Sequence, residues 1–367
     1  MHITKTYKYR LRVSKEQEAT LDRYINTARA VYNLSLETKI YAYQSRKISL
    51  SKFDLMKQLV DCKNDFDWIK EVPSQSLQDV IERMDIAYQS FFKGGGFPKF
   101  AKKDKYNSLT FKSVKQISDY VFKLPKIGTV TIFKDRQPKG ELRRATITRK
   151  NNKYYISIVT KQVIETSIKN DNSQIGIDVG ISHFASLSNG VHIPNPRHTI
   201  RYSRKLRVLS RSLARKKKGS NSRLLAKMQV SKMHEKLTNT RKDFLNKQTR
   251  SLIDQFDTIV VEDLKVKNMI KFGQISKHIS DASWSEFFNQ LEYKSEWNGN
   301  NFLKIDPKYT SQTCNDCGEV DKKSRLSQSK FVCTSCGVES NSDINASKNI
   351  LAKGIGLMRQ RDTLVCA

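Results

Sequence analysis

The chain has 367 residues and a formal net charge of +31, because 67 Lys or Arg residues outnumber 36 Asp or Glu residues. This length predicts two or three domains with substantial hydrophobic cores. No apolar run approaches the ~20 residues of a membrane span, and the N-terminus lacks the apolar segment of a signal peptide, so we expect a soluble, cytoplasmic protein that associates with the nucleoid in use.

The N-terminal region shows strand and helix patterns with clear boundaries. Residues 3–13 alternate between apolar and polar side chains, which predicts a strand. Ser14 and Gln17 form the S-x-x-Q signature of a capping box, and apolar residues recur behind them at helical spacing. Ser76 and Asp79 form the similar signature S-x-x-D, which predicts a second helix start.

A basic and aromatic stretch follows the helical block, which the glycines of residues 94–96 end. Residues 97–112 (FPKFAKKDKYNSLTFK) interleave four aromatic rings with lysines that include Lys102 and Lys103. The rings either stack on nucleobases or form core, and both alternatives stay open. Four strand patterns follow (VFKLP, GTVTIF, RRATITR and KYYISIVT), so we expect a small β-barrel with a helical insertion. The polar residues 165–173 predict a linker to another domain.

The basic excess is concentrated in the next region. Residues 179–234 contain thirteen Lys or Arg and no carboxylate, whereas a surface that only needs solubility usually spreads its charge evenly. A polyanion is the natural partner, because each phosphate contact releases counterions; membrane lipid is the second candidate. The nine basic residues of residues 201–218 are predicted nucleic-acid contacts: Arg201, Arg204, Lys205, Arg207, Arg211, Arg215, Lys216, Lys217 and Lys218.

Three carboxylates occur at the ends of predicted elements. Asp178 lies near the end of the apolar strand QIGIDV, Glu262 ends the strand DTIVVE, and Asp343 begins the predicted helix DINASKNIL. Magnesium prefers such oxygen ligands, and two ions about 3.5–4 Å apart can activate a water and stabilise the leaving oxygen of a phosphodiester. Each signal alone is weak, because an acid at a strand end is often merely solvated. Together they favour a metal-dependent phosphodiester site.

Four of the six cysteines have the spacing of metal ligands. Cys314, Cys317, Cys333 and Cys336 form C-x2-C…C-x2-C with fifteen residues between the pairs. Four thiolates close the coordination sphere of zinc, so we expect a structural and not a catalytic ion. Because this ribbon lies between the last predicted strand and the helix of Asp343, its folding on zinc is expected to fix where that helix begins.

Three segments resemble the RuvC-like motifs and zinc ribbon of the TnpB (OrfB) family, transposon-encoded relatives of type V CRISPR nucleases. They are IGIDVGISHFASLSNG, HEKLTNTRKDFLNKQTRSLIDQFDTIVVEDLKVKNM and YTSQTCNDCG…FVCTSCGVESNSDINASKNIL. The N-terminal KTYKYRLRVSKEQEATLDRYINTARAVYN also looks like this family, so the resemblance covers essentially the whole chain. It implies an RNA-guided DNA endonuclease of an insertion sequence, monomeric in its RNA complex. A guide RNA from the transposon end would direct cutting of matched double-stranded DNA beside a short transposon-adjacent motif.

The resemblance also implies site residues and domains. Asp178, Glu262 and Asp343 would be the catalytic acids that bind Mg²⁺ or Mn²⁺, and the four cysteines would hold structural Zn²⁺. The implied fold is a multidomain α/β fold with four parts. These are a wedge β-barrel (1–14 and 94–165), a helical recognition insertion (15–93), an RNase H-like RuvC nuclease domain (170–312 and 338–367) and the zinc ribbon (313–337). Ser342 departs from the family, because many members have arginine directly before the third acid.

Several contacts and functions stay open. Leu206, Leu209 and Leu213 share one helical face with the surrounding basic residues, which predicts a helix or helix pair against the guide–target duplex, or else a merely solvated helix. Gln75 and Gln78 could read the adjacent motif, because amide side chains can pair with adenine. The competing functions are a guide-dependent DNA-binding repressor, a DNA-joining transposase using the same acids, and an actin-like ATPase, which would explain QIGIDVG alone.

Overall fold

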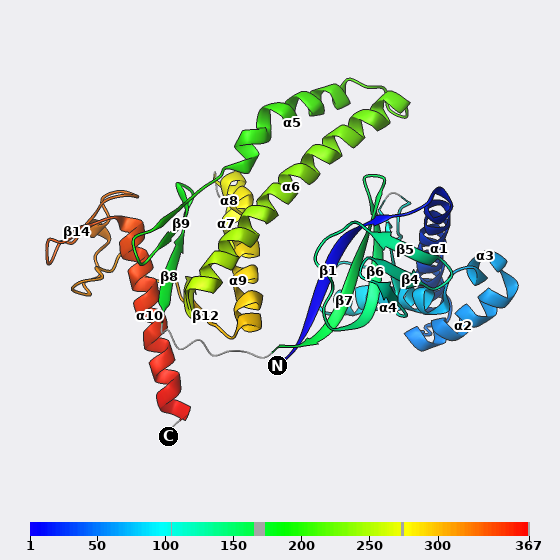
Figure 1. Ribbon diagram of the computed structural model, residues 1–367, viewed down its shortest axis with the longest axis horizontal. Coiled ribbons are helices and arrows are strands. Elements are labelled where there is room, and N and C mark those ends of the chain that lie inside the picture. Colours follow the sequence, from blue (N-terminus) through cyan, green and yellow to red (C-terminus); the bar gives the residue numbers. More distant parts are fainter. Residues whose placement is uncertain (104, 165–172, 273–274, 366–367) are drawn as a thin grey trace. The chain divides into compact units, whose positions relative to one another are not determined.

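The computed structural model describes residues 1–103, 105–164, 173–272 and 275–365 (Figure 1). The chain divides into two compact units, Met1–Ile164 (unit 1) and Glu165–Ala367 (unit 2). Except for Ser173, the predicted linker at residues 165–173 lies outside the described residues. Among the helices of the described part of the chain, none is both long and apolar enough to cross a membrane.

Unit 1 contains a seven-stranded antiparallel sheet of order β2-β6-β7-β1-β5-β4-β3. The predicted N-terminal strand is confirmed as β1 (His2–Arg12), and it pairs with β7 (Lys153–Val163) from His2↔Val163 to Arg10↔Tyr155. The other strands are β2 (Ser108–Phe111), β3 (Lys115–Ser118), β4 (Val121–Leu124), β5 (Gly128–Ile132) and β6 (Glu141–Lys150).

Four helices accompany this sheet: α1 (Lys15–Arg46), α2 (Lys52–Asp65), α3 (Asp67–Lys70) and α4 (Ser74–Phe92). The capping box of Ser14 and Gln17 is confirmed, with both of its hydrogen bonds present. The second predicted start was wrong by three residues, because the N-cap of α4 is Pro73 and its first helical residue is Ser74. Ser76 is therefore buried inside the first turns, and Asp79 pairs with Arg83 at 2.7 Å.

The four rings of the basic and aromatic stretch (residues 97–112) differ in burial: two belong to the core and two are exposed. Phe111 is fully buried in β2, and Tyr106 packs against the core of unit 1. Phe97 and Phe100 are 48% and 52% exposed, so only the first half of the stretch presents rings to solvent.

Unit 2 is built on a five-stranded mixed sheet of order β10-β9-β8-β11-β12. Its strands are β8 (Gln174–Val179), β9 (His183–Leu187), β10 (His192–Pro194), β11 (Thr258–Glu262) and β12 (Asn301–Ile305). Strands β8, β11 and β12 are parallel, so their carboxyl ends meet at one edge, whereas β8, β9 and β10 pair antiparallel.

Helices cover both faces of this sheet. Alternate side chains of β11 face opposite ways: Ile259 and Val261 join the core with α6 (Asn221–Gln255) and α9 (Trp284–Asn298), whereas Val260 joins Ile350 of α10 (Ser342–Val365). The basic segment forms α5 (His198–Ala214), which packs against α6 as a helical hairpin (Figure 1). The remaining elements are α7 (Val266–Phe272), α8 (Ser276–Ala282), the 3-10 turn η1 (Lys322–Ser324), β13 (Phe331–Val332) and β14 (Glu339–Ser340).

Candidate active site and metal centre

The structure brings the three predicted acids together at the carboxyl edge of the unit 2 sheet. Asp178, Glu262 and Asp343 line one cavity of about 290 Å³. Val261 of β11 pairs with Ile177 of β8, so the residues that follow them, Glu262 and Asp178, lie level on neighbouring parallel strands. The sheet register alone therefore places two carboxylates side by side.

The third acid comes from α10, which lies close against the sheet. A Cβ on Gly176 of β8 would collide with the Ser347 carbonyl oxygen, and a Cβ on Gly354 would lie 2.6 Å from a Val260 methyl group. Two glycines, one on the strand and one on the helix, thus permit the close approach. Asp343, in the first turn of α10, consequently reaches the pocket of the two strand acids.

Burial raises the pKa values of all three carboxylates. Burial, reinforced by the carboxylates of Glu262 and Asp343, raises the pKa of Asp178 to about 8. Burial also raises the pKa of Glu262 and the pKa of Asp343, and Arg325 opposes the shift at all three sites. Thr310 Oγ1 donates a hydrogen bond of 2.5 Å to Glu262 Oε1, which favours its ionised form.

The acid pocket suits hard divalent cations. It offers carboxylate oxygens from three segments, and their clustered negative charge calls for a compensating cation. Within the described residues, the four cysteines form the one group of three or more such side chains placed to hold a single ion. The three carboxylates line the same cavity without forming such a group.

Arg325 is the site residue that the sequence did not reveal. Its Nη2 lies 3.4 Å from Asp343 Oδ1, and the residue lines the acid pocket. It belongs to the segment between the two cysteine pairs, in which it is the single arginine. At the start of α10, Ser342 Oγ donates to the Ser327 carbonyl oxygen at 2.8 Å. The start of α10 is therefore tied to the cysteine-rich segment by two side-chain contacts.

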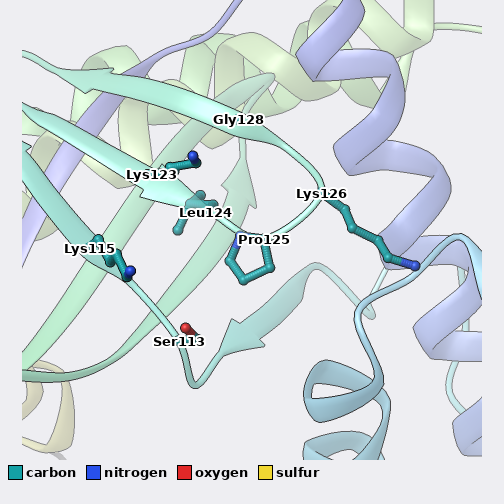
Figure 2. Close-up of a pocket in the computed structure, with 7 residues that line it drawn as sticks. All are labelled: Ser113, Lys115, Lys123, Leu124, Pro125, Lys126 and Gly128. Atoms are coloured by element: carbon teal, nitrogen blue, oxygen red, sulfur yellow. The ribbon is translucent and has the colours of Figure 1, made fainter.

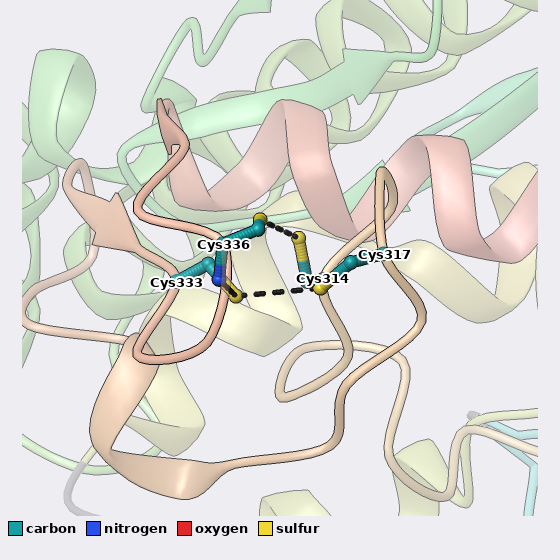
Figure 3. A group of neighbouring side chains, drawn as sticks. All are labelled: Cys314, Cys317, Cys333 and Cys336. Carbon is teal, nitrogen blue, oxygen red and sulfur yellow. Dashed lines mark hydrogen bonds between the residues drawn. The ribbon is translucent and has the colours of Figure 1, made fainter.

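The four predicted cysteines form one cluster, shown in Figure 3. The Sγ atoms of Cys314 and Cys336 are 3.7 Å apart, and those of Cys317 and Cys333 are 3.5 Å apart. A tetrahedral zinc with Zn–S bonds of about 2.3 Å requires S···S separations of about 3.8 Å, so the cluster fits a structural metal. The Cys336 amide donates to Cys333 Sγ at 3.4 Å, a hydrogen bond that favours the thiolate form of Cys333.

Hydrogen bonds connect this cluster to the helix of Asp343. Asn345 is buried in the first turns of α10, and its Nδ2 donates to the Thr313 carbonyl oxygen at 2.7 Å. Its Oδ1 accepts from the Asn315 amide at 3.0 Å, and Asn349 Nδ2 donates to the same Thr313 oxygen at 2.6 Å. The loop that carries the first cysteine pair is therefore fastened directly to α10.

The basic segment presents its charge to solvent. All nine predicted contact residues between Arg201 and Lys218 are exposed, whereas Leu206, Leu209 and Leu213 are partly buried. The predicted helix is confirmed as α5. Arg223 Nη1 donates to the carbonyl oxygens of Leu213 and Lys216 at 2.9 Å each, so it caps the end of α5.

The remaining predicted contacts lie in unit 1. Gln75 is exposed and Gln78 is partly buried near the start of α4, while Lys102 and Lys103 are exposed.

Figure 2 shows a cavity of about 360 Å³ beside the turn between β4 and β5. Lys115, Lys123 and Lys126 contribute to its lining with Ser113, Leu124, Pro125 and Gly128, and no carboxylate, histidine or cysteine lines it. The lysines of this hollow therefore offer positive charge that suits an anion.

The fold is shared with RNA-guided CRISPR proteins. Cas12f1, solved in a complex with sgRNA and target DNA, aligns with a TM-score of 0.62 and 13% identity over 95% of this chain and 98% of that one. The mini-RNA-guided endonuclease CRISPR-Cas phi3 aligns with a TM-score of 0.54 and 10% identity over 96% and 92% of the two chains. These similarities place the chain in the class of Cas12-like α/β folds.

Sequence relatives define the family. InsQ of Escherichia coli K12, named as an RNA-guided DNA endonuclease, is 33% identical over 95% of this chain and 92% of InsQ. A protein of the same functional name from Streptomyces pristinaespiralis is 30% identical over 96% and 90%. Family models match residues 157–273 (OrfB_IS605, "Probable transposase"), 284–350 ("Cas12f1-like, TNB domain") and 1–47 ("Helix-turn-helix domain"). The chain belongs to the TnpB (OrfB) family, which confirms the resemblance found in its motifs.

Proposed function

We propose that this protein is an RNA-guided DNA endonuclease that hydrolyses phosphodiesters at the pocket of Asp178, Glu262 and Asp343. The observation that carries the proposal is the convergence of these three acids, from two parallel strands and one helix, in a single cavity. The full-length relatives named as RNA-guided DNA endonucleases support the guided activity.

In this proposal unit 2 is an RNase H-like RuvC nuclease domain (170–312 and 338–367) that carries the zinc ribbon (313–337). The sheet order, with three antiparallel strands followed by two parallel additions, supports this assignment. Unit 1 is the wedge domain (1–14 and 94–165) with the helical recognition insertion (15–93). The shared Cas12-like fold over nearly the whole chain supports it.

The residues of the pocket would each perform a distinct task. Asp178, Glu262 and Asp343 would hold Mg²⁺ or Mn²⁺, which when bound supplies an activated water and charge stabilisation at the leaving oxygen. Thr310 keeps a Glu262 oxygen oriented through its 2.5 Å hydrogen bond. Arg325 carries a positive charge beside Asp343, so it would offset the repulsion among the acids and attract the scissile phosphate.

The partners in this proposal are a guide RNA from the transposon end and double-stranded target DNA. The exposed basic residues of α5 would contact the guide–target duplex through its backbone, and Lys102 and Lys103 would contact phosphates. Gln75 and Gln78 would lie against the adjacent motif. Four cysteine sulfurs at suitable separations would hold Zn²⁺ as a structural ion.

Two alternative functions, a repressor and a transposase, differ in how they would use Asp178, Glu262 and Asp343. A guide-dependent repressor needs binding without cleavage, and the complete set of three acids argues against it. A DNA-joining transposase would use the same acids, but it would not require a guide for cleavage. Cleavage therefore separates the nuclease from the repressor, and a guide requirement for cleavage separates the nuclease from the transposase.

The test is to purify the chain with its transposon-end RNA and sequence the nucleic acid that co-purifies. The preparation is then incubated with Mg²⁺ and a plasmid library that carries a guide-matched target beside randomised flanking bases. We expect one discrete RNA and guide-dependent cutting that disappears in Asp178→Ala. Heterogeneous nucleic acid with no guide-dependent cutting would overturn the proposal, and binding without cutting would indicate the repressor.

A further inference from the structure

A strained tyrosine stands beside the acid pocket. Tyr309 has φ +68°, a left-handed conformation that bulky residues rarely adopt, and its side chain is 49% exposed. Burial of the ring therefore does not explain the conformation. Strained residues of this kind persist only where the surrounding structure fixes them, and they gather at functional sites.

Hydrogen bonds from Thr313, Asn349 and Lys353 fix the loop around Tyr309. The Tyr309 carbonyl oxygen accepts from the Thr313 amide at 3.0 Å and from Thr313 Oγ1 at 2.8 Å. Asn349 Nδ2 of α10 donates to the Thr310 carbonyl oxygen at 2.9 Å, and Lys353 Nζ donates to the Lys308 carbonyl oxygen at 2.5 Å. The residues on both sides of the tyrosine are thus anchored to the helix that carries Asp343.

The same loop forms one wall of the acid pocket. Pro307, Thr310 and Ser311 line the cavity, while the ring of Tyr309 is not part of its lining. Thr310, the next residue, donates directly to Glu262. Tyr309 is therefore next in the chain to Thr310, which contacts Glu262. The Tyr309 ring itself lies outside the cavity that would hold a scissile phosphate.

The chemistry of this position matches a nucleotide. An exposed aromatic face can stack on any unpaired base, and such stacking is tolerant of sequence. Lys308 Nζ lies 4.8 Å from the centre of the Tyr309 ring, so a cation is available for a flanking phosphate. The three groups match successive parts of one strand. The Tyr309 ring would contact a base, Lys308 would contact the flanking phosphate, and the acid pocket would hold the scissile phosphate.

We propose that Tyr309 and Lys308 form a subsite that binds one unpaired nucleobase and its flanking phosphate next to the scissile bond. The left-handed backbone and its anchors hold the ring in place before the strand arrives, so the strand enters the pocket in one register. This inference rests on the proposed nuclease function of the acid pocket, and it adds a contact that sets the position of the cut.

The test compares variants that separate the ring from the strain. Tyr309→Gly removes the ring and fits the positive φ, so it should raise the melting temperature of unit 2 by about 2–4 °C while it lowers the cleavage rate about 10- to 100-fold. Tyr309→Phe keeps the ring and should cut like the wild type. Ser283→Gly is the matched control, because Ser283 also has positive φ (58°) in unit 2 and does not line the acid pocket.

A binding measurement tests the stacking without relying on cleavage. Single-stranded DNA with 2-aminopurine at successive positions is added to the purified RNA-bound protein in an Asp178→Asn background. We expect quenching of the fluorescence at one position, retained in Tyr309→Phe and lost in Tyr309→Gly. In the cleavage assay, Tyr309→Gly should also spread the cuts over several neighbouring positions.

The outcomes separate this inference from the proposed function. If the wild type makes no guide-dependent cut, the proposed function fails and the fluorescence still decides the stacking. Wild-type rate and cut position in Tyr309→Gly would overturn the subsite, as would quenching that is equal with and without the ring.

Discussion

The two clusters of ionisable side chains in unit 2 are assembled in opposite ways. The four cysteines lie within 23 consecutive residues, Cys314 to Cys336, and are gathered by two short local turns. The three acids are separated by up to 165 positions along the chain, since Asp178 and Asp343 come from β8 and α10. The cysteine cluster depends on its own loop, whereas the acid pocket depends on the whole sheet and the helix against it.

This difference has an energetic consequence. The thiols have little hydrophobic core around them, since the cluster packs only Phe331 with Cys314 and Cys333, so the metal would contribute much of the local folding energy. The acids sit on a fully packed framework that holds them together despite their repulsion. We therefore expect that removal of metal unfolds the four-cysteine segment but leaves the acid pocket folded and without its ions.

The largest expected effect comes from neutralising one acid. Asp178→Asn, Glu262→Gln or Asp343→Asn should lower the guide-dependent cleavage rate at least about 1000-fold, because each removes a metal ligand worth several kcal/mol in the transition state. The melting temperature should not fall, because the repulsion among the acids decreases. Asp263→Asn is the matched control, since Asp263 follows Glu262 but pairs with Lys265 in solvent. A normal cleavage rate in any of the three acid variants would contradict its assigned role.

The next effect concerns the cysteine cluster. Cys314→Ser should lower the zinc content measured by metal analysis and lower the cleavage rate about 10- to 100-fold, because the start of α10 loses its support. Cys62→Ser in unit 1 is the control, since Cys62 lies apart from the four-cysteine cluster. Full zinc content together with full activity in the Cys314 variant would show that the two sites are not coupled.

A smaller effect should appear in the pH dependence of metal binding. The folded state raises the pKa of Asp178 from 3.8 to about 8, so folding favours the protonated form. Without metal, stability should fall as the pH rises from about 4 toward 8, because the carboxyl ionises in the unfolded chain over this range while the buried carboxyl keeps its proton. Mg²⁺ favours the ionised form, so its stabilisation of unit 2 in a thermal melt should be larger at pH 8.5 than at pH 6. Asp178→Asn should weaken this difference, and an equal shift at both pH values in the wild type would contradict the account.

The smallest effect tests the connection between the two sites. Asn345→Ala removes the acceptor of the Asn315 amide and one of the two donors to the Thr313 carbonyl oxygen, which should lower the unfolding free energy by about 1–3 kcal/mol. Chemical denaturation measures this change, and zinc content should stay normal while the cleavage rate falls by less than about tenfold. The exposed Asn246→Ala on α6 is the control, and an unchanged Asn345 variant would mean that the sites are joined elsewhere.

The sequence predicted the parts of the site that follow from local pattern. Asp178 and Glu262 end apolar strands, and parallel strands bring such ends to one edge, so their neighbourhood could be anticipated from the chain alone. Arg325 could not, because its proximity to Asp343 arises only when the cysteine-rich segment folds back on α10.

Local sequence patterns predict the structure incorrectly where tertiary packing determines a helix boundary or a backbone conformation. Ser76 and Asp79 have the spacing of a capping box, but Pro73 begins the helix earlier and the core of unit 1 buries the serine. Similarly, nothing in the sequence around Tyr309 signals its positive φ, which depends on hydrogen bonds from α10 to the residues beside it.

The central claim is that three carboxylates from distant segments share one divalent-metal site. The most direct measurement is a calorimetric titration of the RNA-bound protein with Mn²⁺ at pH 8. It compares the wild type with Asp178→Asn, Glu262→Gln and Asp343→Asn. We expect the wild type to bind Mn²⁺ with proton release and each of the three variants to lose at least one ion. Wild-type stoichiometry and affinity in all three variants would contradict it.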